Sequence, residues 1–372
     1  MTILTPDDLT ELQRVHLRIA DKDFHNWSDV TLEQQLDCVS TCSFSAPFEP
    51  DREDFRKLFR PFTFPRVEVY VGGVLRFTGR LVDISPQRAA DRATVSVTCY
   101  GLPGTLADCC MPWGRERTSG QFTGLRLPQI ATRLCAPFGI GVSVDDRSST
   151  VSTIAGRDRT SPFKVAKIET DQKIWDFLCE LARQRGLVLT DDAEGNLLIR
   201  KSLPVGAAAP VVELFEGKPP LLSVASTFSP QDYFSDVTVI AKAHRGQASS
   251  GWTARNPFLR DVLRPTTHRC DDVQKGDSQL TADDRLARML ANCASWDVEL
   301  PTAVDPSGEL YRPNTLVNLQ APGAMIYGKH SFLVRTVTMR QDANSTTCKL
   351  GLALPGAFSG QMPPVLPWSE VA

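Results

Sequence analysis

The sequence predicts a mixed β and α+β fold, with two related small antiparallel β-barrel domains separated by an α/β insert domain. Apolar and polar residues alternate between turn signals in the first and last parts of the chain, which is typical of antiparallel strands. The middle part changes to helical spacing. One hairpin pattern near the start returns near the end. The predicted domains are 1–108 (first barrel), 109–203 (insert), 204–358 (second barrel) and 359–372 (extended Pro-rich tail).

The first region is predicted to contain short antiparallel strands. Residues 29–47 alternate as a strand, a short link and a second strand, whereas residues 47–65 are Pro-rich and charged, as expected of a connection. A hairpin follows at 67–86, where apolar residues alternate with polar ones on either side of a turn at Gly72-Gly73. A further alternating strand completes the region.

The middle region is predicted to contain two amphipathic helices and a hairpin. Residues 127–134 place apolar side chains at helical spacing. The clearest helix lies within 170–186, carries an apolar stripe on one face, and can be capped by Thr170 or Asp171. A hairpin that turns at 194–196 follows. These elements indicate a small α/β unit.

The last region returns to strand patterning after a Pro/Ala-rich linker at 202–212. Residues 244–280 are polar with few apolar positions, so we expect a long loop there. A helix capped by Thr281 is predicted to follow. Residues 331–356 then repeat the pattern of residues 79–101, with a strand, a polar turn and a Thr-rich strand. The matching Leu-Val pairs are Leu81-Val82 and Leu333-Val334.

Composition argues against several classes of protein. Lysine and arginine total 41 and aspartate and glutamate 43, a formal charge of −2, which argues against a nucleic-acid binder. No apolar run approaches the roughly 20 residues needed to span a bilayer. The first residues lack the basic start and apolar stretch of a secretion signal. We therefore expect a protein made in a cytoplasm, without obligatory disulfides among its ten cysteines.

No set of residues indicates catalysis, a cofactor or a metal site. The P-loop, G-x-G-x-x-G and G-x-S-x-G motifs are absent. Cys38 and Cys42 could join Cys109-Cys110 around zinc, but the C-x2-C spacing of structural zinc sites is missing. We therefore expect no catalytic, cofactor-binding or metal-binding residues.

Two other groups of residues could act as catalytic residues. His268 and Cys270 could form a nucleophile pair, although a structural role is much commoner for such residues. Neighbouring carboxylates such as Asp191-Asp192 are frequent in the sequence. A glycosidase, however, needs two carboxylates that converge in a cleft, and spacing along the chain does not show convergence.

The order of these patterns resembles the baseplate hub proteins of contractile-tailed phages, in particular the Mu-like tail hub or late control D family. The resemblance covers most of the chain. Its most distinctive part is the helix and hairpin at 173–201. The segments that carry it are "VEVYVGGVLRFTGRLVDISP…ATVSVTCYG", "GQFTGLRLPQIATRLCAPFGIGV", "KIWDFLCELARQRGLVLTDDAEGNLLIRK" and "NTLVNLQAPGAMIYGKHSFLVRTVTMRQDANSTTCKLGLALP".

The resemblance implies a virion protein that is assembled in the host cytoplasm and is not an enzyme. It implies a ring-shaped homotrimer at the tail tip, in contact with the hexameric tail tube on one face and with the trimeric spike on the other, beside baseplate wedge proteins. Two related barrels in each of three chains would present six similar units around one axis. Phage DNA would pass through the central channel in transit only.

We expect the interfaces of this ring in edge strands at 67–82 and 331–354, whose open backbone groups can pair with neighbours. Two alternative functions remain open. A tail-tip cell-wall hydrolase would need converging acids, and a nucleic-acid channel or binding protein would show a steep salt dependence of its DNA affinity. The residues expected at the interfaces are Val69, Val71, Gly72, Gly73, Leu81, Val82, Leu333 and Val334.

Overall fold

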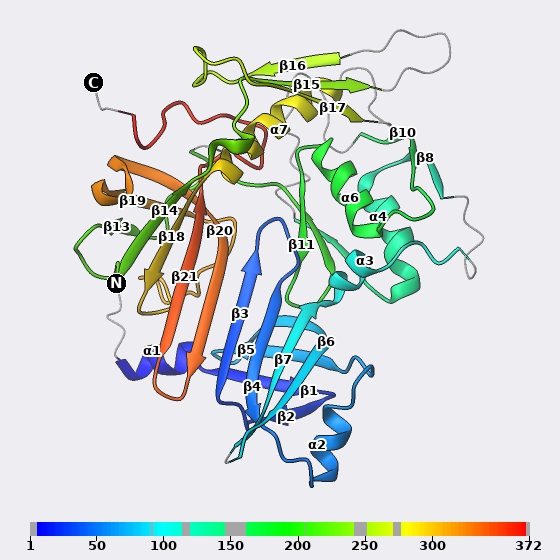
Figure 1. Ribbon diagram of the computed structural model, residues 1–372, viewed down its shortest axis with the longest axis vertical. Coiled ribbons are helices and arrows are strands. Elements are labelled where there is room, and N and C mark those ends of the chain that lie inside the picture. The colour runs from blue at the N-terminus through cyan, green and yellow to red at the C-terminus, as the bar shows by residue number, and fades with distance from the viewer. Residues whose placement is uncertain are drawn as a thin grey trace.

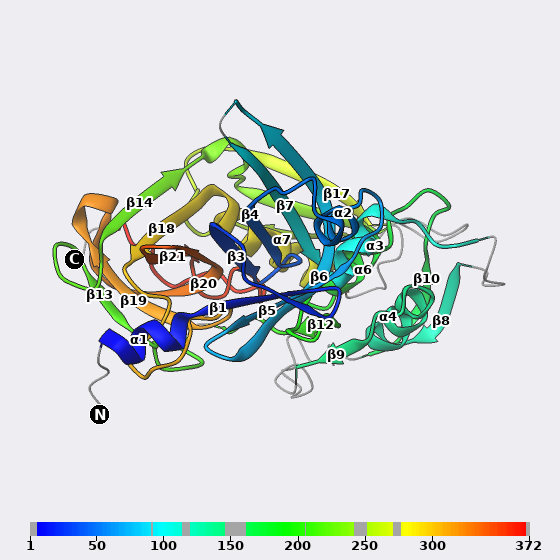
Figure 2. The same ribbon diagram turned by 90° about the horizontal axis from the view of Figure 1, so that it is seen from below.

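The computed structural model describes residues 6–90, 92–113, 120–145, 161–204, 206–241, 251–270 and 277–369. Two β-rich regions lie side by side, the first drawn in blue and cyan and the last in orange and red, and a helical part lies to one side of them (Figure 1). The view from below shows the helical part at one end of an elongated molecule (Figure 2).

The first β region confirms the predicted hairpin at 67–86. Val67, Val69 and Val71 are buried on one face of β5, and Gly72 and Gly73 form the turn with positive φ angles of 57° and 76°. The predicted connection at 47–65 contains a helix that sequence reasoning missed. The elements are α1 (Pro6–Gln13), β1 (Val15–Ile19), β2 (Lys22–Phe24), β3 (Asp29–Gln35), β4 (Thr41–Pro47), α2 (Glu53–Leu58), β5 (Arg66–Val71), β6 (Val74–Arg88) and β7 (Ala93–Gly101).

The middle part contains the two predicted helices and the hairpin. The predicted cap of the second helix is wrong, because α6 begins after Lys173 and no side chain caps it. The N–H of Ile174 instead donates to the carbonyl of Cys109 at 3.1 Å. The elements are η1 (Leu102–Gly104), α3 (Thr105–Asp108), β8 (Gln121–Leu125), α4 (Leu127–Cys135), η2 (Ala136–Phe138), β9 (Val142–Val144), β10 (Phe163–Lys167), α6 (Ile174–Arg183), β11 (Val188–Asp191) and β12 (Leu197–Arg200).

The last part is again mostly strand. Its helix α7 starts four residues before the predicted cap, so Thr281 lies inside the helix. No helix among the described residues is long and apolar enough to cross a membrane. The elements are β13 (Glu213–Phe215), β14 (Ser223–Phe228), η3 (Pro230–Asp232), β15 (Asp236–Ala241), β16 (Gly251–Arg255), β17 (Pro265–Cys270), α7 (Asp277–Cys293), β18 (Ala294–Leu300), β19 (Leu316–Ala321), η4 (Pro322–Ala324), β20 (Ile326–Asp342) and β21 (Thr346–Ala353).

The predicted long loop at 244–280 is wrong where β16 and β17 lie. These strands flank β15 in a small sheet whose one face packs on α7, where Val239, Ala254 and Cys270 are buried. The other face is exposed, so few apolar residues mark these strands in the sequence. Residues 244–250 and 271–276 of this prediction lie outside the described residues.

The two β regions form one sheet of 13 strands. Its main order is β14-β18-β21-β20-β3-β4-β7-β6-β5-β1-β2, and β13 joins through β19, which pairs with β20. The pairing of β3 with β20 connects the regions across about 300 residues of chain. Among the described residues no sheet closes on itself, so the two predicted barrels are not confirmed as barrels.

Buried side chains divide in the same way as the sheets. One large apolar cluster runs through both β regions and includes Phe44 and Trp296. A second cluster lies within the middle part, where Ile174, Phe177 and Leu181 of α6 face α4 and β8. Strands of the middle part form their own small sheets and contribute nothing to the large sheet. The amphipathic pattern of α6 thus reflects packing inside a separate core.

Candidate functional site

The hairpins β6–β7 and β20–β21 are structural copies of one another. Each contains a bulge of one extra residue, Val82 in the first and Arg335 in the second, at which the pairing register shifts. Because such irregularities are specific features of a strand pair, their recurrence at the same place is strong evidence of a repeat. In Figure 1 the two hairpins lie in neighbouring halves of the sheet.

The ladders beyond the two bulges also match. Residues 83–88 pair with 93–98, and residues 336–341 pair with 346–351, without a further shift. In each hairpin a backbone hydrogen bond lies just beyond the last paired residues. The bonds are Ala89 N–H to Arg92 carbonyl (2.7 Å) and Asp342 N–H to Ser345 carbonyl (3.0 Å).

The sequence comparison aligned the two copies one residue out of register. It matched Leu81 with Leu333, whereas the bulges match Leu81 with Val334. The burial of the side chains supports the match given by the bulges: Leu81 and Val334 both lie in the shared core, while Leu333 is buried in a different cluster. The predicted repeat at 79–101 and 331–356 is therefore present, with a correction of one residue.

The strands around the two hairpins repeat as well. The order β3-β4-β7-β6-β5 of the first region corresponds to the order β14-β18-β21-β20-β19 of the second. Strands β3 and β14 are thus equivalent, and they do not pair with each other. A second register shift follows Val69 in β5 and its counterpart Leu319 in β19. The outermost strands differ, because β1 is antiparallel to β5 whereas β13 is parallel to β19.

The repeat has one junction inside the chain. Strand β3 of the first region pairs antiparallel with residues 336–342 of β20, and Leu36 N–H donates to the carbonyl of Arg335 at 2.8 Å. The counterparts of these two strands are β14 and residues 83–88 of β6. Among the described residues neither counterpart has a strand on its outer side. The β3–β20 pairing is therefore formed within the chain, whereas the two strand edges that could form an equivalent pairing are both unpaired among the described residues.

Most of the residues predicted at interfaces are buried inside the chain. Val69, Val71, Leu81, Leu333 and Val334 are at most 2 % exposed, so their side chains belong to the interior of the chain. The assignment of 67–82 and 331–354 as edge strands is wrong, because β5, β20 and β21 have strands on both sides. Val82 is the bulged residue, and Gly72 and Gly73 form the β5–β6 turn. Sequence alternation found strands but could not show which strands are outermost.

The face of the large sheet that points away from the core is polar. Serine, threonine and glutamine alternate with the buried residues of β3, β4, β7, β18 and β21. Charged side chains of both signs are interspersed among them. They include the acids Asp29, Glu33, Asp83, Asp297 and Glu299 and the bases Arg80, Arg340 and Lys349.

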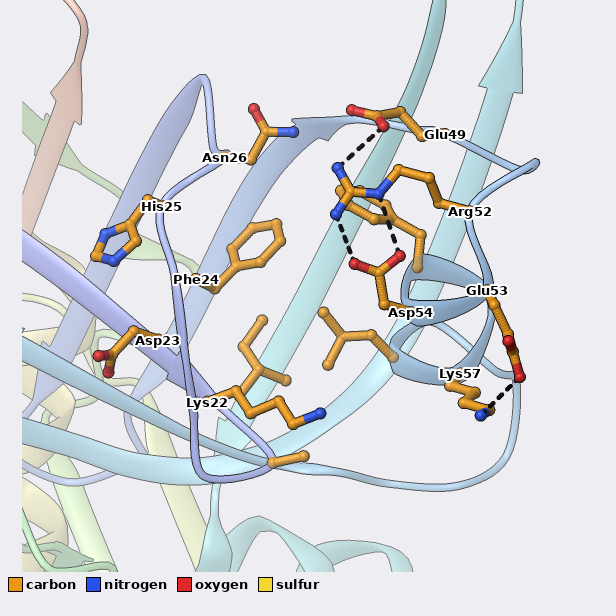
Figure 3. A pocket seen from close by; sticks show the side chains of 14 residues that line it. Lys22, Asp23, Phe24, His25, Asn26, Glu49, Arg52, Glu53, Asp54 and Lys57 are labelled. Carbon is orange, nitrogen blue, oxygen red and sulfur yellow. Dashed lines mark hydrogen bonds and ion pairs between the residues drawn. The ribbon is translucent and has the colours of Figure 1, made fainter.

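A pocket of about 820 Å³ lies between the β2 segment and α2 (Figure 3). Its acids are paired rather than free: Arg52 binds Glu49 at 3.2 Å and also Asp54, and Lys57 binds Glu53 at 2.7 Å. These side chains are about half exposed or more. Paired acids in an open pocket do not form the two converging carboxylates that glycoside hydrolysis needs.

Asp191 is a buried carboxyl at the end of β11. Its Oδ1 accepts hydrogen bonds from the backbone N–H and the hydroxyl of Ser40, both at 2.8 Å. Burial raises the pKa of Asp191 to about 6, while the bonds from Ser40 act in the opposite direction. Because the carboxyl lies in a packed joint between the middle part and the first β region, its position indicates a structural role.

The other candidates for chemistry do not come together. Cys42 is buried in the large core, and His268 and Cys270 are alternate residues of β17, about 7 Å apart along the strand. Burial and the charge of Arg285 lower the pKa of His268. Within the described ranges, no three His, Cys, Asp or Glu side chains are grouped as metal ligands would be.

Comparisons with known proteins point in one direction. The family model of the second domain of gp44-like baseplate hub proteins matches residues 103–201. Baseplate hub protein gp44 of Escherichia phage Mu is 24% identical over 355 residues, which cover 91% of this chain and 87% of gp44.

Two solved structures share the fold. The 43 kDa tail protein of prophage MuSo2 from Shewanella oneidensis superimposes with a TM-score of 0.74 at 22% identity, covering 93% of this chain and 99% of that one. The tail protein from Neisseria meningitidis MC58 also gives 0.74, at 17% identity and with coverage of 93% and 98%. Over nearly its whole length, this chain resembles the baseplate hub proteins of Mu-like contractile-tailed phages.

Proposed function

We propose that this chain is the structural hub of a contractile-tail baseplate: a homotrimeric ring with pseudo-sixfold symmetry that joins the hexameric tail tube to the trimeric spike. The ring is part of the virion, contacts baseplate wedge proteins at its rim and catalyses no reaction. The observation that carries the proposal is the repeat of five strands with the same bulge in both copies of its hairpin.

Symmetry explains why a repeated chain suits this position. A ring of three chains has three identical patches, which can match a threefold partner. If each chain contributes two similar units, the same ring also presents six similar patches, which can match a sixfold partner. The two β regions share strand order and the register of the bulged hairpin, whereas the middle part occurs once per chain.

The polar face of the large sheet suits the wall of a channel for DNA in transit. Proteins hold DNA by neutralising phosphates with several lysine and arginine side chains. On this face charges of both signs are mixed, and Lys349 is already paired with Asp297 at 2.9 Å. Such a wall would let a polyanion pass without binding it.

The alternative is a cell-wall hydrolase, which could use the pocket beside α2. Its paired carboxylates argue against that function. Clearing of peptidoglycan by the purified chain, lost in a Glu53→Gln variant, would favour the hydrolase over the structural hub.

The proposal is tested by the mass and shape of the purified protein. Native mass spectrometry should show three times the 41.0 kDa chain, and electron microscopy should show rings with a central opening. The sample should also be mixed with tube and spike proteins of the same tail. A chain that stays monomeric at all concentrations and associates with neither partner would overturn the proposal.

A further inference from the structure

We propose that β14 of one copy pairs antiparallel with residues 83–88 of β6 in the next copy, in the register that β3 and β20 adopt within one chain. This inference rests on the trimeric ring proposed above and specifies its seam. The partner is a second copy of this chain, because the equivalent pairing, of β3 with β20, is already present within one chain.

The register of the β3–β20 pair can be applied to β14 because β3 and β14 occupy equivalent positions in the two β regions. Each pairs with a strand that in turn pairs with the second strand of a repeated hairpin, β4 with β7 and β18 with β21. Residues therefore correspond row by row across three strands. The matched rows are Val30, Phe44 and Val97 in the first region and Val224, Val298 and Leu350 in the second.

The other side of the seam follows from the bulges. Residues of β6 beyond Val82 correspond to residues of β20 beyond Arg335. Each pair of the junction inside the chain then predicts one pair between copies. The pairs Val337–Gln34, Met339–Leu32 and Gln341–Val30 become Ile84–Phe228, Pro86–Ser226 and Arg88–Val224.

The backbone groups of both edges point as this seam requires. Ser229 donates its N–H to the carbonyl of Cys293, so odd-numbered residues of β14 bond to β18 and even-numbered residues face outward. Ala89 donates its N–H to the carbonyl of Arg92, so even-numbered residues of β6 beyond the bulge also face outward. The proposed register sets outward-facing residues opposite outward-facing residues at every pair.

The side chains at the seam are also compatible. Phe228 is 38 % exposed although its ring packs edge-on against Trp296 and Trp368. Its proposed partner Ile84 is half-buried against the same large core. Pairing of the two strands would extend this core from one copy to the next and cover the exposed part of the phenylalanine ring. No residue of β14 carries a charge that pairing would bury.

Pro86 makes the seam between copies weaker than the junction within the chain. Its counterpart Met339 has an N–H, whereas proline cannot donate to the carbonyl of Ser226. Proline on an open edge also hinders pairing with unrelated strands. Pro86 therefore disfavours pairing of the β6 edge with unrelated strands in the free chain. The other outward-facing backbone groups of β6 can still form hydrogen bonds with β14 of the next copy.

A disulfide can test the register directly. Ser85 and Thr227 would face each other in a non-hydrogen-bonded pair, in which Cα atoms lie about 4.5 Å apart, a distance that a disulfide accepts. The double variant S85C/T227C of the full chain should give covalent dimers and trimers in most of the protein under mild oxidation. Reductant should return them to single chains.

A matched control shifts one cysteine along the strand. In S85C/S223C the second thiol lies four residues out of register, about 13 Å away along β14, and no cross-link is expected. The single variants S85C and T227C control for the native cysteines, of which Cys38 is exposed. Amide hydrogen exchange of the unmodified protein provides a second measurement: the amides of Val224 and Phe228 should slow at least about tenfold on assembly.

The outcomes separate the seam from the ring. Cross-linking in register together with slowed exchange supports the seam. A trimer without the S85C/T227C cross-link, or with equal yield in S85C/S223C, overturns the seam and leaves the proposed trimer standing. Unchanged exchange at β14 in the trimer also overturns it. A chain that remains monomeric overturns both proposals.

Discussion

The two β regions share a strand order but differ in the connection that follows their first strand. In the first region β3 and β4 are joined by residues 36–40, whereas the equivalent strands β14 and β18 are joined by residues 229–293. The long connection contains β15, β16, β17 and α7, which form a separate cluster at one end of the molecule (Figure 1). The strand order of the sheet is thus the same in both regions, although the connection between β14 and β18 is much longer than the one between β3 and β4.

The regions also differ in the size of equivalent core residues. Cys42 and Trp296 occupy the same position, because Cys42 pairs with Cys99 and Trp296 with Leu352, the residues that pair with Leu81 and Val334 just before the two bulges. Both are fully buried. The indole of Trp296 packs with Phe332, Phe228 and Trp368, so the second region relies on an aromatic cluster at a place where the first has a small side chain. Equivalent topology therefore does not imply equivalent energetics.

Truncating this matched pair should give the largest difference. Trp296→Ala is expected to lower the free energy of unfolding by about 3–5 kcal/mol, because it leaves a large cavity. Cys42→Ala removes one sulfur atom and should cost much less. Chemical denaturation of both variants measures the difference. Equal losses would contradict the assignment of the aromatic cluster as the centre of the second region.

The two edges can be compared through Met339 and Pro86. Met339→Ala should lower the free energy of unfolding by about 2–5 kcal/mol, because its side chain is 5 % exposed. Pro86→Ala should cost at most about 1 kcal/mol. It should also strengthen association by about 0.5–1.5 kcal/mol for each seam, since alanine restores an N–H donor. Trimer dissociation by dilution is the measurement, and weaker association would contradict the proposed role of Pro86.

The joint between the middle part and the first region should respond to pH. The folded-state pKa of Asp191 is raised from 3.8 to about 6, so the folded chain binds this proton more tightly than the unfolded chain. Its contribution to stability is therefore fully present below 3.8 and is lost as pH rises through about 6. Asp191→Asn should remove this dependence in denaturation measured at several pH values. Parallel curves for the two proteins would show that the burial argument is wrong.

The smallest effect is expected on the polar face. Lys349 forms an exposed ion pair with Asp297, and its counterpart in the first region is Ser96. Lys349→Ala should change the free energy of unfolding by at most about 1 kcal/mol, similar to Ser96→Ala. A loss comparable to that of Met339→Ala would mean that this face is packed rather than open.

Elements with a strong periodic pattern could be predicted from the sequence. The β5–β6 hairpin, α4 and α6 are where alternation or helical spacing indicated them, because one face of each is buried. β16 and β17 were missed because only one face of their sheet packs on a helix, and α2 was missed within a charged, Pro-rich stretch.

The assembly edges could not be predicted in the same way. The pairing of β3 with β20 joins residues such as Val30 and Gln341, and no local pattern links them. The sequence alignment of the repeats matched the Leu-Val pairs, which differ by one residue in their position relative to the bulges at Val82 and Arg335, and these bulges cannot be seen in the sequence. Once the strand pairing and its register are known, β14 and residues 83–88 of β6 can be identified as unpaired edges.

An image of the assembled ring by electron cryomicroscopy at side-chain resolution tests the central claim most directly. The account predicts three chains whose two β regions are related by a rotation of about 60° around the ring axis. Junctions between β3 and β20 should alternate with seams between β14 and β6 of adjacent copies. A ring in which the copies meet through other surfaces, with β14 and residues 83–88 unpaired, would contradict it.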